Sequence, residues 1–236
     1  MGLVLRRPLR TALSAACCGA AATSLPAAAQ TGAGAPPVLV EMFLSQSCKS
    51  SPPAAEVAAE LGAREDVVAL VWHVDYWNIL SAGPGGRWKD PYSKPDFAER
   101  QRAYNRRIRG KGTVFTPQAV VNGASSVVGS KREAVEKNID AAHMNAAPAR
   151  LDVTEAADAL SVSVSGAAGD VFLVEFHPEA ITAIEGGDNA GVMFTEANVV
   201  SSITRLGAAS GSATFSAAAP ASDMGCAVIL QEPGPG

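Results

Sequence analysis

The chain has 236 residues, of which 47% are hydrophobic and 18% charged, and its formal net charge is -4 at pH 7. A chain of this length forms one large domain or two small ones. The acidic balance argues against a general nucleic-acid-binding protein, because neutralising phosphates requires an excess of Lys and Arg. Beyond the N-terminal region there is no second long apolar run, so we expect no membrane span in the mature chain.

The N-terminal residues have the pattern of an export signal. Three arginines within the first ten residues precede the small apolar run 12–22, and Ala29 follows at a suitable cleavage point. We therefore expect residues 1–29 to be removed as a signal peptide and residues 30–37 to form a flexible lead. The mature protein is expected to be secreted or periplasmic, and the pattern leaves open the general or the twin-arginine export route.

The segment after the lead predicts an α/β unit. Near-continuous apolar runs predict buried strands over 38–43 and 67–72, with a helix over 52–61 between them. Ser51 is expected at the N-cap of this helix, with Pro52 at the first helical position. A strand, a helix and a second strand form a right-handed βαβ unit, and sites in open α/β sheets lie at the carboxyl ends of the strands.

The remaining elements of this first domain, 38–147, follow in chain order. They are an irregular stretch at 76–92, a helix at 96–109 ended by Gly110, a hairpin turning at Asn122-Gly123, and a helix at 131–143. Ser130 and Glu133 have the spacing of a capping box for this last helix.

After Pro148 the pattern becomes that of short strands. Alternating or apolar runs predict strands at 151–154, 160–164, 171–176 and 226–231, with Gly-Asp turns between some of them. We expect residues 148–236 to form a small all-β domain, a sandwich packed against the α/β part.

Cys48 is the candidate nucleophile. It lies in the turn after strand 38–43, where the N-terminus of the next helix and the charge of Lys49 favour a thiolate. A cysteine three residues later would complete a Cys-x-x-Cys redox motif, but Ser51 occupies that position. Apart from the two cysteines in the expected signal peptide, the chain has Cys48 and Cys226, and a structural disulfide between them is an alternative in an oxidising compartment.

A metal site is not expected. His73 and Asp75 alternate on a strand and share a face, but a metal needs three or four ligands, and the other histidines, His143 and His177, are distant in the sequence. A hydrogen-bonded His-Asp pair is the favoured interpretation. Alternatively, Asp75 lines a cleft beside Cys48 together with nearby aromatic residues.

Five strings of the sequence resemble a bacterial secreted family. They are residues 40–48, 73–77, 88–92, 100–104 and 116–123. The family is known only as a domain of unknown function, number twelve twenty-three, and is described as thioredoxin-like. The resemblance implies a thioredoxin-like βαβ–α–ββα fold for residues 38–147, followed by the β-rich domain. The chain departs from the family at Ser51, where the family usually has the second cysteine.

The resemblance also implies roles for individual residues. Pro117, after Thr116, is similar to the cis-proline that faces the thiol in thioredoxin-like folds and exposes the preceding backbone to an extended peptide. Glu41, buried on the first strand, is similar to an acid that relays protons for thiolate chemistry, and otherwise is a strand acid paired at an edge. Independently of the resemblance, Trp77 and Trp88, with Asp75, are expected to line the substrate cleft, and core packing explains the aromatic residues equally well.

The expected function is thiol-disulfide chemistry with one cysteine. A Cys48 thiolate can form a mixed disulfide with a protein or a small thiol or disulfide substrate, but Ser51 cannot resolve it. The alternative is a redox-inactive module that binds a peptide or another ligand. No cofactor is expected under either hypothesis.

Overall fold

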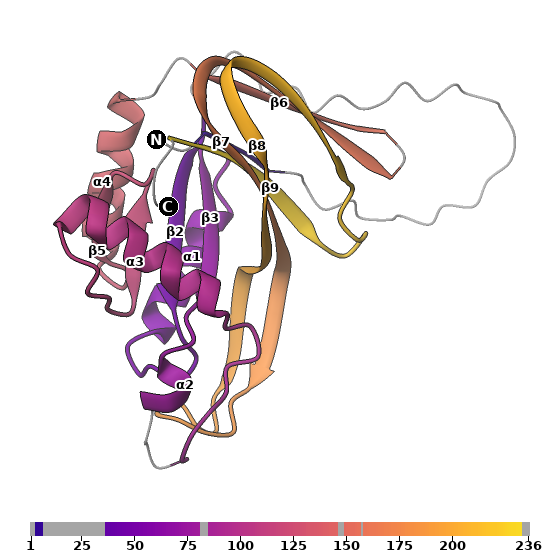
Figure 1. The fold of residues 1–236 in the computed structure, drawn as a ribbon. Helices are drawn as coiled ribbons and strands as arrows, with labels where there is room; N and C mark the ends of the chain where they lie inside the picture. The colour runs from indigo at the N-terminus through magenta and orange to yellow at the C-terminus, as the bar shows by residue number, and fades with distance from the viewer. Residues whose placement is uncertain (1–2, 7–35, 81–84, 146–148, 157, 233–236) are drawn as a thin grey trace, which may run out of the picture.

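The computed structural model describes residues 3–6, 36–80, 85–145, 149–156 and 158–232. Nine strands form one sheet, in the order β1-β9-β7-β8-β3-β2-β4-β5, with β6 paired to β7 (Figure 1). The strands are β1 (Leu3–Arg6), β2 (Val38–Leu44), β3 (Val67–His73), β4 (Gln118–Val121), β5 (Ser125–Val128), β6 (Arg150–Ala156), β7 (Ala159–Ala183), β8 (Met193–Ala218) and β9 (Gly225–Gln231). The helices in this part of the chain are α1 (Pro52–Gly62), α2 (Trp77–Leu80), α3 (Pro95–Arg109) and α4 (Arg132–Met144).

The first half of the chain forms the α/β unit that its sequence predicts. Strands β2 and β3 are parallel and every residue of both is buried, as their near-continuous apolar sequences require. β4 runs antiparallel to β2, and β5 runs antiparallel to β4 through the predicted Asn122-Gly123 turn. Helices α1 and α4 pack on one face of these strands, and α3 packs on the other, where it crosses in front of the sheet in Figure 1.

The second half extends the same sheet. β7 and β8 form an antiparallel hairpin of 25 and 26 residues, and β8 joins β3 in parallel at Val71 and Val199. β9 pairs with β7 on the other side, and this end of the sheet curves strongly in Figure 1. The expected separate sandwich is therefore not confirmed, because β6–β9 continue the sheet of the first half and strands β7, β8 and β9 supply residues to its two cores.

Two local expectations about helix starts need correction. Ser51 and Pro52 occupy the predicted positions at the start of α1, but the Ser51 side chain makes no capping hydrogen bond. The expected capping box at Ser130 and Glu133 is wrong, because Lys131 is the N-cap of α4 and no side chain caps this helix.

The expected export signal lies mostly outside the described residues. Of residues 1–29 the structure describes only Leu3–Arg6, which pair as β1 with the outer side of β9. Most of the expected lead, 30–35, also lies outside the described part. Among the described helices, none is long and apolar enough to span a membrane.

Candidate functional site

Cys48 lies in a tight turn that connects the carboxyl end of β2 to α1. The Cys48 N–H donates to the carbonyl of Ser45 at 3.1 Å, and the Ser51 N–H donates to the carbonyl of Cys48 at 2.9 Å. The Ser45 N–H donates to the Ser51 hydroxyl at 3.3 Å, and both serines are fully buried. Ser51 is therefore part of the packing of the turn and holds its two ends together.

The thiol of Cys48 faces the peptide that the sequence predicts to lie opposite. Its Sγ is 3.9 Å from the carbonyl oxygen of Thr116, and the Thr116-Pro117 bond is cis, as predicted. The Trp77 indole donates to the Thr116 hydroxyl at 2.6 Å, so a fourth predicted residue belongs to this group. The structure thus brings Cys48, Thr116, Pro117 and Trp77 together at one end of the sheet.

The thiol of Cys48 is buried beneath the surface of the protein. Cys48 is only 3% exposed, whereas Lys49 beside it is exposed. Cys48 carries a free thiol, and Cys226 lies in β9, within the core cluster of β6–β9. The Cys48–Cys226 disulfide considered above is therefore not formed in this structure.

Tyr76 packs against the core cluster that includes α3. Its hydroxyl donates to the side-chain oxygen of Gln101 at 3.1 Å. Burial raises the pKa of Tyr76, and the hydrogen bond to Gln101 offsets only part of this increase. Asp75, the neighbouring predicted residue, is half-buried, and its carbonyl accepts a hydrogen bond from Asn78 in α2.

Glu41 lies on the α3 face of β2 and forms a buried ion pair. Its carboxylate accepts hydrogen bonds from Arg100 at 2.7 and 3.0 Å and another from the Tyr104 hydroxyl. Glu41 is fully buried on a central strand, so it is not an acid at a sheet edge. Its partners in the described chain are structural groups of α3, and the proton relay to Cys48 stays a prediction.

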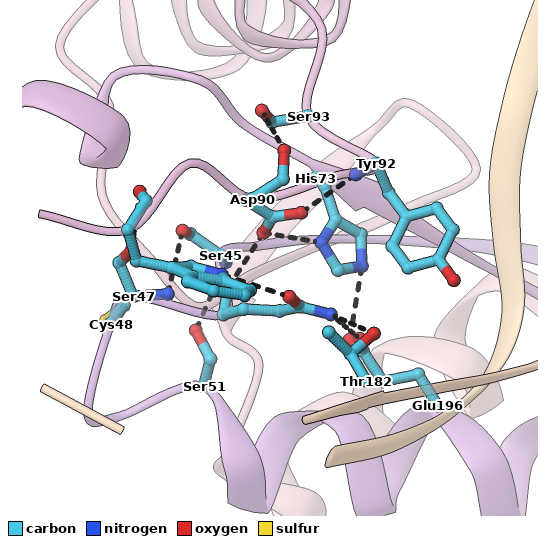
Figure 2. A network of polar contacts seen from close by, with 12 residues as sticks. Ser45, Ser47, Cys48, Ser51, His73, Asp90, Tyr92, Ser93, Thr182 and Glu196 are labelled. Atoms are coloured by element: carbon cyan, nitrogen blue, oxygen red, sulfur yellow. Dashed lines mark hydrogen bonds and ion pairs between the residues drawn. The ribbon is translucent and has the colours of Figure 1, made fainter. Parts of the chain in front are cut away.

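His73 lies on the opposite face of the sheet, between two carboxylates. Its Nδ1 is 2.7 Å from Oδ2 of Asp90, and its Nε2 is 3.1 Å from Oε1 of Glu196, although this second contact is not aligned as a hydrogen bond (Figure 2). All three side chains are buried. His73 thus pairs with Asp90, and the expected pairing with Asp75 is wrong.

The charges of this group determine its protonation. Burial alone would lower the pKa of His73, but the carboxylates of Asp90 and Glu196 outweigh it and hold the pKa well above the ordinary value. Burial alone would raise the pKa of Asp90, but His73 and the N–H groups of Gln46 and Tyr92 lower it. These shifts favour the protonated form of His73 and the ionised form of Asp90 at neutral pH. In the described residues, no three His, Cys, Asp or Glu side chains are arranged to hold a metal.

Gln46 connects this charged group to the thiol turn. The Gln46 N–H donates to Asp90 at 2.9 Å, and its side-chain amide donates to Glu196 at 3.0 Å and to Thr182 at 3.1 Å. The Trp88 indole donates to the side-chain oxygen of Gln46 at 3.2 Å. Trp88 is therefore near the turn, as predicted, and it contributes to the hydrogen bonding of Gln46, while its role in lining a cleft stays a prediction.

A second amide fixes the backbone of the turn. The side-chain amide of Asn189, between β7 and β8, donates to the carbonyls of Gln46 at 2.7 Å and of Cys48 at 3.0 Å. Sequence reasoning missed Gln46, Asn189 and Glu196. Gln46 lies in a string that carries the family resemblance, but the other two are more than 140 residues away and carry no local signal.

Comparisons with known proteins found a matching family and a solved structure with a similar fold. Residues 39–231 match the family described as "Protein of unknown function (DUF1223)". A crystal structure of a protein from Agrobacterium tumefaciens is similar with a TM-score of 0.67 and 26% sequence identity, over 82% of this chain and 93% of that one. No curated protein matches the sequence.

Proposed function

The chain belongs to the DUF1223 family, and from this premise we propose that it is an exported thioredoxin-like protein that carries out thiol-disulfide exchange through the single thiol of Cys48. The strand order β3-β2-β4-β5, with β4 antiparallel to β2 and helices on both faces, supports the thioredoxin-like interpretation of residues 38–147. The observation that carries the functional proposal is the position of the Cys48 sulfur, 3.9 Å from the Thr116 carbonyl and just before α1.

The proposed reaction is an exchange with no net oxidation of the protein. The Cys48 thiol gives its proton to solvent, and the thiolate attacks one sulfur of a substrate disulfide. A bond forms between Cys48 and that sulfur while the substrate's S–S bond breaks, and the other sulfur leaves as a thiolate. An external thiol then attacks the mixed disulfide and restores Cys48. The Ser51 hydroxyl cannot perform this second attack, so the release step depends on the external thiol.

A second candidate function is a binding module without redox turnover. Two observations favour it: Cys48 is 3% exposed, and Ser51 is built into the hydrogen bonding of the turn. In this case the fold keeps the surface around Thr116 and Trp77, and the thiol is inert.

Incubation of the reduced protein with glutathione disulfide separates the two functions. We expect a glutathione adduct on Cys48, located by peptide mass spectrometry, that a second thiol removes. Cys48→Ser should form no adduct at this position. Wild-type protein that is folded, reduced and still free of adduct at Cys48 would contradict the exchange function and favour the binding module.

Ser51→Cys tests whether the site geometry suits dithiol chemistry. The introduced thiol would lie three residues after Cys48 at the start of α1, so we expect it to form a disulfide with Cys48 and to bring a gain of insulin reduction in the presence of dithiothreitol. Ser210→Cys, in an exposed part of β8, adds one thiol away from the turn and is the control. Equal activity of the two variants would contradict this prediction.

A further inference from the structure

The tip of the β7–β8 hairpin lies against the thiol turn. Gly191 donates to the Ile184 carbonyl at 2.7 Å and Val192 donates to the Asn189 carbonyl at 3.1 Å, which closes residues 184–192 into a compact loop. Asp188 and Ala190 on either side of Asn189 are exposed, but Asn189 itself is only 7% exposed, because its side chain points into the turn.

The loop is also fixed to the segment before Trp88. The Gly187 N–H donates to the Gly86 carbonyl at 2.9 Å. Gly186 packs so closely that a Cβ added there would lie 2.8 Å from the Arg87 carbonyl oxygen, so this contact requires glycine. The position of Asn189 is therefore defined from both sides, by the hairpin strands and by residues 86–87.

We propose that the 184–192 loop is a cap on the thiol turn and that Asn189 is the positioning residue that controls access to Cys48. One amide group binds the carbonyls of both Gln46 and Cys48. A movement that carries Cys48 away from Thr116 toward solvent has to break these two hydrogen bonds. The cap thereby keeps the sulfur beside the Thr116 carbonyl and 3% exposed.

The cap gives the C-terminal half of the chain a role in the site. Thr182 and Glu196, on the strands that carry the loop, hold the side chain of Gln46, while Asn189 holds the backbone. A substrate that displaces Asn189 from the two carbonyls would free the thiol, so exchange would follow the opening of the cap. This consequence rests on the proposed function, whereas the capping of Cys48 does not.

The test is the rate at which iodoacetamide alkylates Cys48 in the full chain, read by peptide mass spectrometry so that Cys226 is counted separately. Each hydrogen bond of ordinary net strength disfavours opening by about fivefold, so Asn189→Ala should raise the rate roughly 10- to 30-fold. Asn189→Asp keeps the size of the side chain but removes the donor, and it should raise the rate by a similar factor. Asn189→Ser, with a shorter side chain and one donor, should give an intermediate rate.

Asn198→Ala is the matched control. Asn198 is a buried asparagine of the same hairpin, and its amide donates to the Ala69 carbonyl in β3 at 3.0 Å. This variant should lose stability but leave the Cys48 rate at the wild-type value under conditions where urea titration shows all proteins folded. Wild-type rates in the folded Asn189 variants would overturn the inference. Faster alkylation without glutathione adducts in any protein would support the cap and contradict the exchange function.

Discussion

Two buried ionic groups lie on opposite faces of the central strands. Glu41, on β2, pairs with Arg100 of α3, and His73, at the end of β3, lies between Asp90 and Glu196. Charged groups remain in an interior only when partners compensate for the lost hydration, and removing one partner leaves the other as an uncompensated buried charge. Substitutions of these residues should therefore lower the free energy of unfolding more clearly than they change the reactivity of Cys48.

Glu41→Gln should destabilise the protein without changing the chemistry of the thiol. The substitution leaves the buried Arg100 guanidinium without a counter-charge, and we expect a loss of about 3 to 5 kcal/mol in the free energy of unfolding, measured in urea. Both oxygens of Glu41 are occupied by Arg100 and Tyr104, so the pH profile of Cys48 alkylation should not change.

Glu60→Gln is the control, because it removes a carboxylate from an exposed pair with Arg132 and should change stability little. A shifted pH profile in folded Glu41→Gln would instead support the proton relay that the family resemblance implies.

The charged state of His73 predicts a fall of stability at alkaline pH. Because its pKa in the folded protein lies above the ordinary value of 6.5, the stabilisation is complete below about pH 6.5 and is lost as the pH rises toward the folded-state pKa. The free energy of unfolding should decrease above pH 6.5 by at most about 1.4 kcal/mol per pH unit from this group.

Glu196→Gln removes one of the two carboxylates that raise the pKa of His73, so the decrease in stability should end at a lower pH. His143→Asn, which replaces an exposed histidine paired with Asp66, should leave the wild-type dependence unchanged. Urea titrations from pH 6 to 8 measure all three proteins, and identical curves for Glu196→Gln and wild type would contradict the assignment.

At the scale of elements, close packing between β7 and β9 fixes their register. Gly225 of β9 is paired with Phe176 of β7, and a Cβ at Gly225 would lie 2.2 Å from the Phe176 ring. The ring belongs to the core shared with α3, where it has little room to move. This contact joins the last strand of the chain to the core of the first half.

Gly225→Ala should therefore lower the free energy of unfolding by about 1 to 3 kcal/mol, the usual cost of overpacking a core. Gly112→Ala is the control, because a Cβ there meets only ordinary contacts, the nearest being 3.4 Å from Arg106. Equal stabilities of the two variants in urea would show that the Phe176 ring moves aside at no cost.

For the whole molecule, the single sheet predicts that the two halves of the chain depend on each other. Ala180, Phe194 and Val199 belong to the core that includes α1 and α4, while Val174 and Ile229 belong to the core that includes α3. We expect the full chain to unfold in one cooperative transition in urea and the fragment 38–147, the expected first domain, to show none. A fragment with its own cooperative transition would contradict this expectation and support the predicted division into two domains.

Local patterns in the sequence were sufficient for the first half of the fold. Continuous apolar runs gave β2 and β3, and Pro52 and Gly110 marked the start of α1 and the end of α3. The resemblance to a known family placed Pro117 opposite Cys48. In each case the residues that determine the structure are close together in the chain, or they belong to one of the five strings that resemble the family.

The second half was harder because its strands depend on their partners. Residues 166–170 have the composition of a turn, yet β7 runs through them with a register shift between Ser165 and Ala167. Much of β8 consists of Gly, Ala and Ser, which have little strand preference of their own and pair because β7 lies beside them. For the same reason, the contacts of Asn189 and Glu196 with Gln46 had no signal in the sequence.

The distance along the chain between the turn and its supports has a consequence for biogenesis. Three of the groups that immobilise residues 46–48, Thr182, Asn189 and Glu196, lie 136 to 150 positions downstream, so the ribosome makes them long after Cys48. During most of its synthesis the growing polypeptide therefore has an uncovered Cys48 thiol. The thiol becomes fully covered only after residues 182–196 have been made. The interval before that closure is when oxidants and stray cysteines reach this atom most easily.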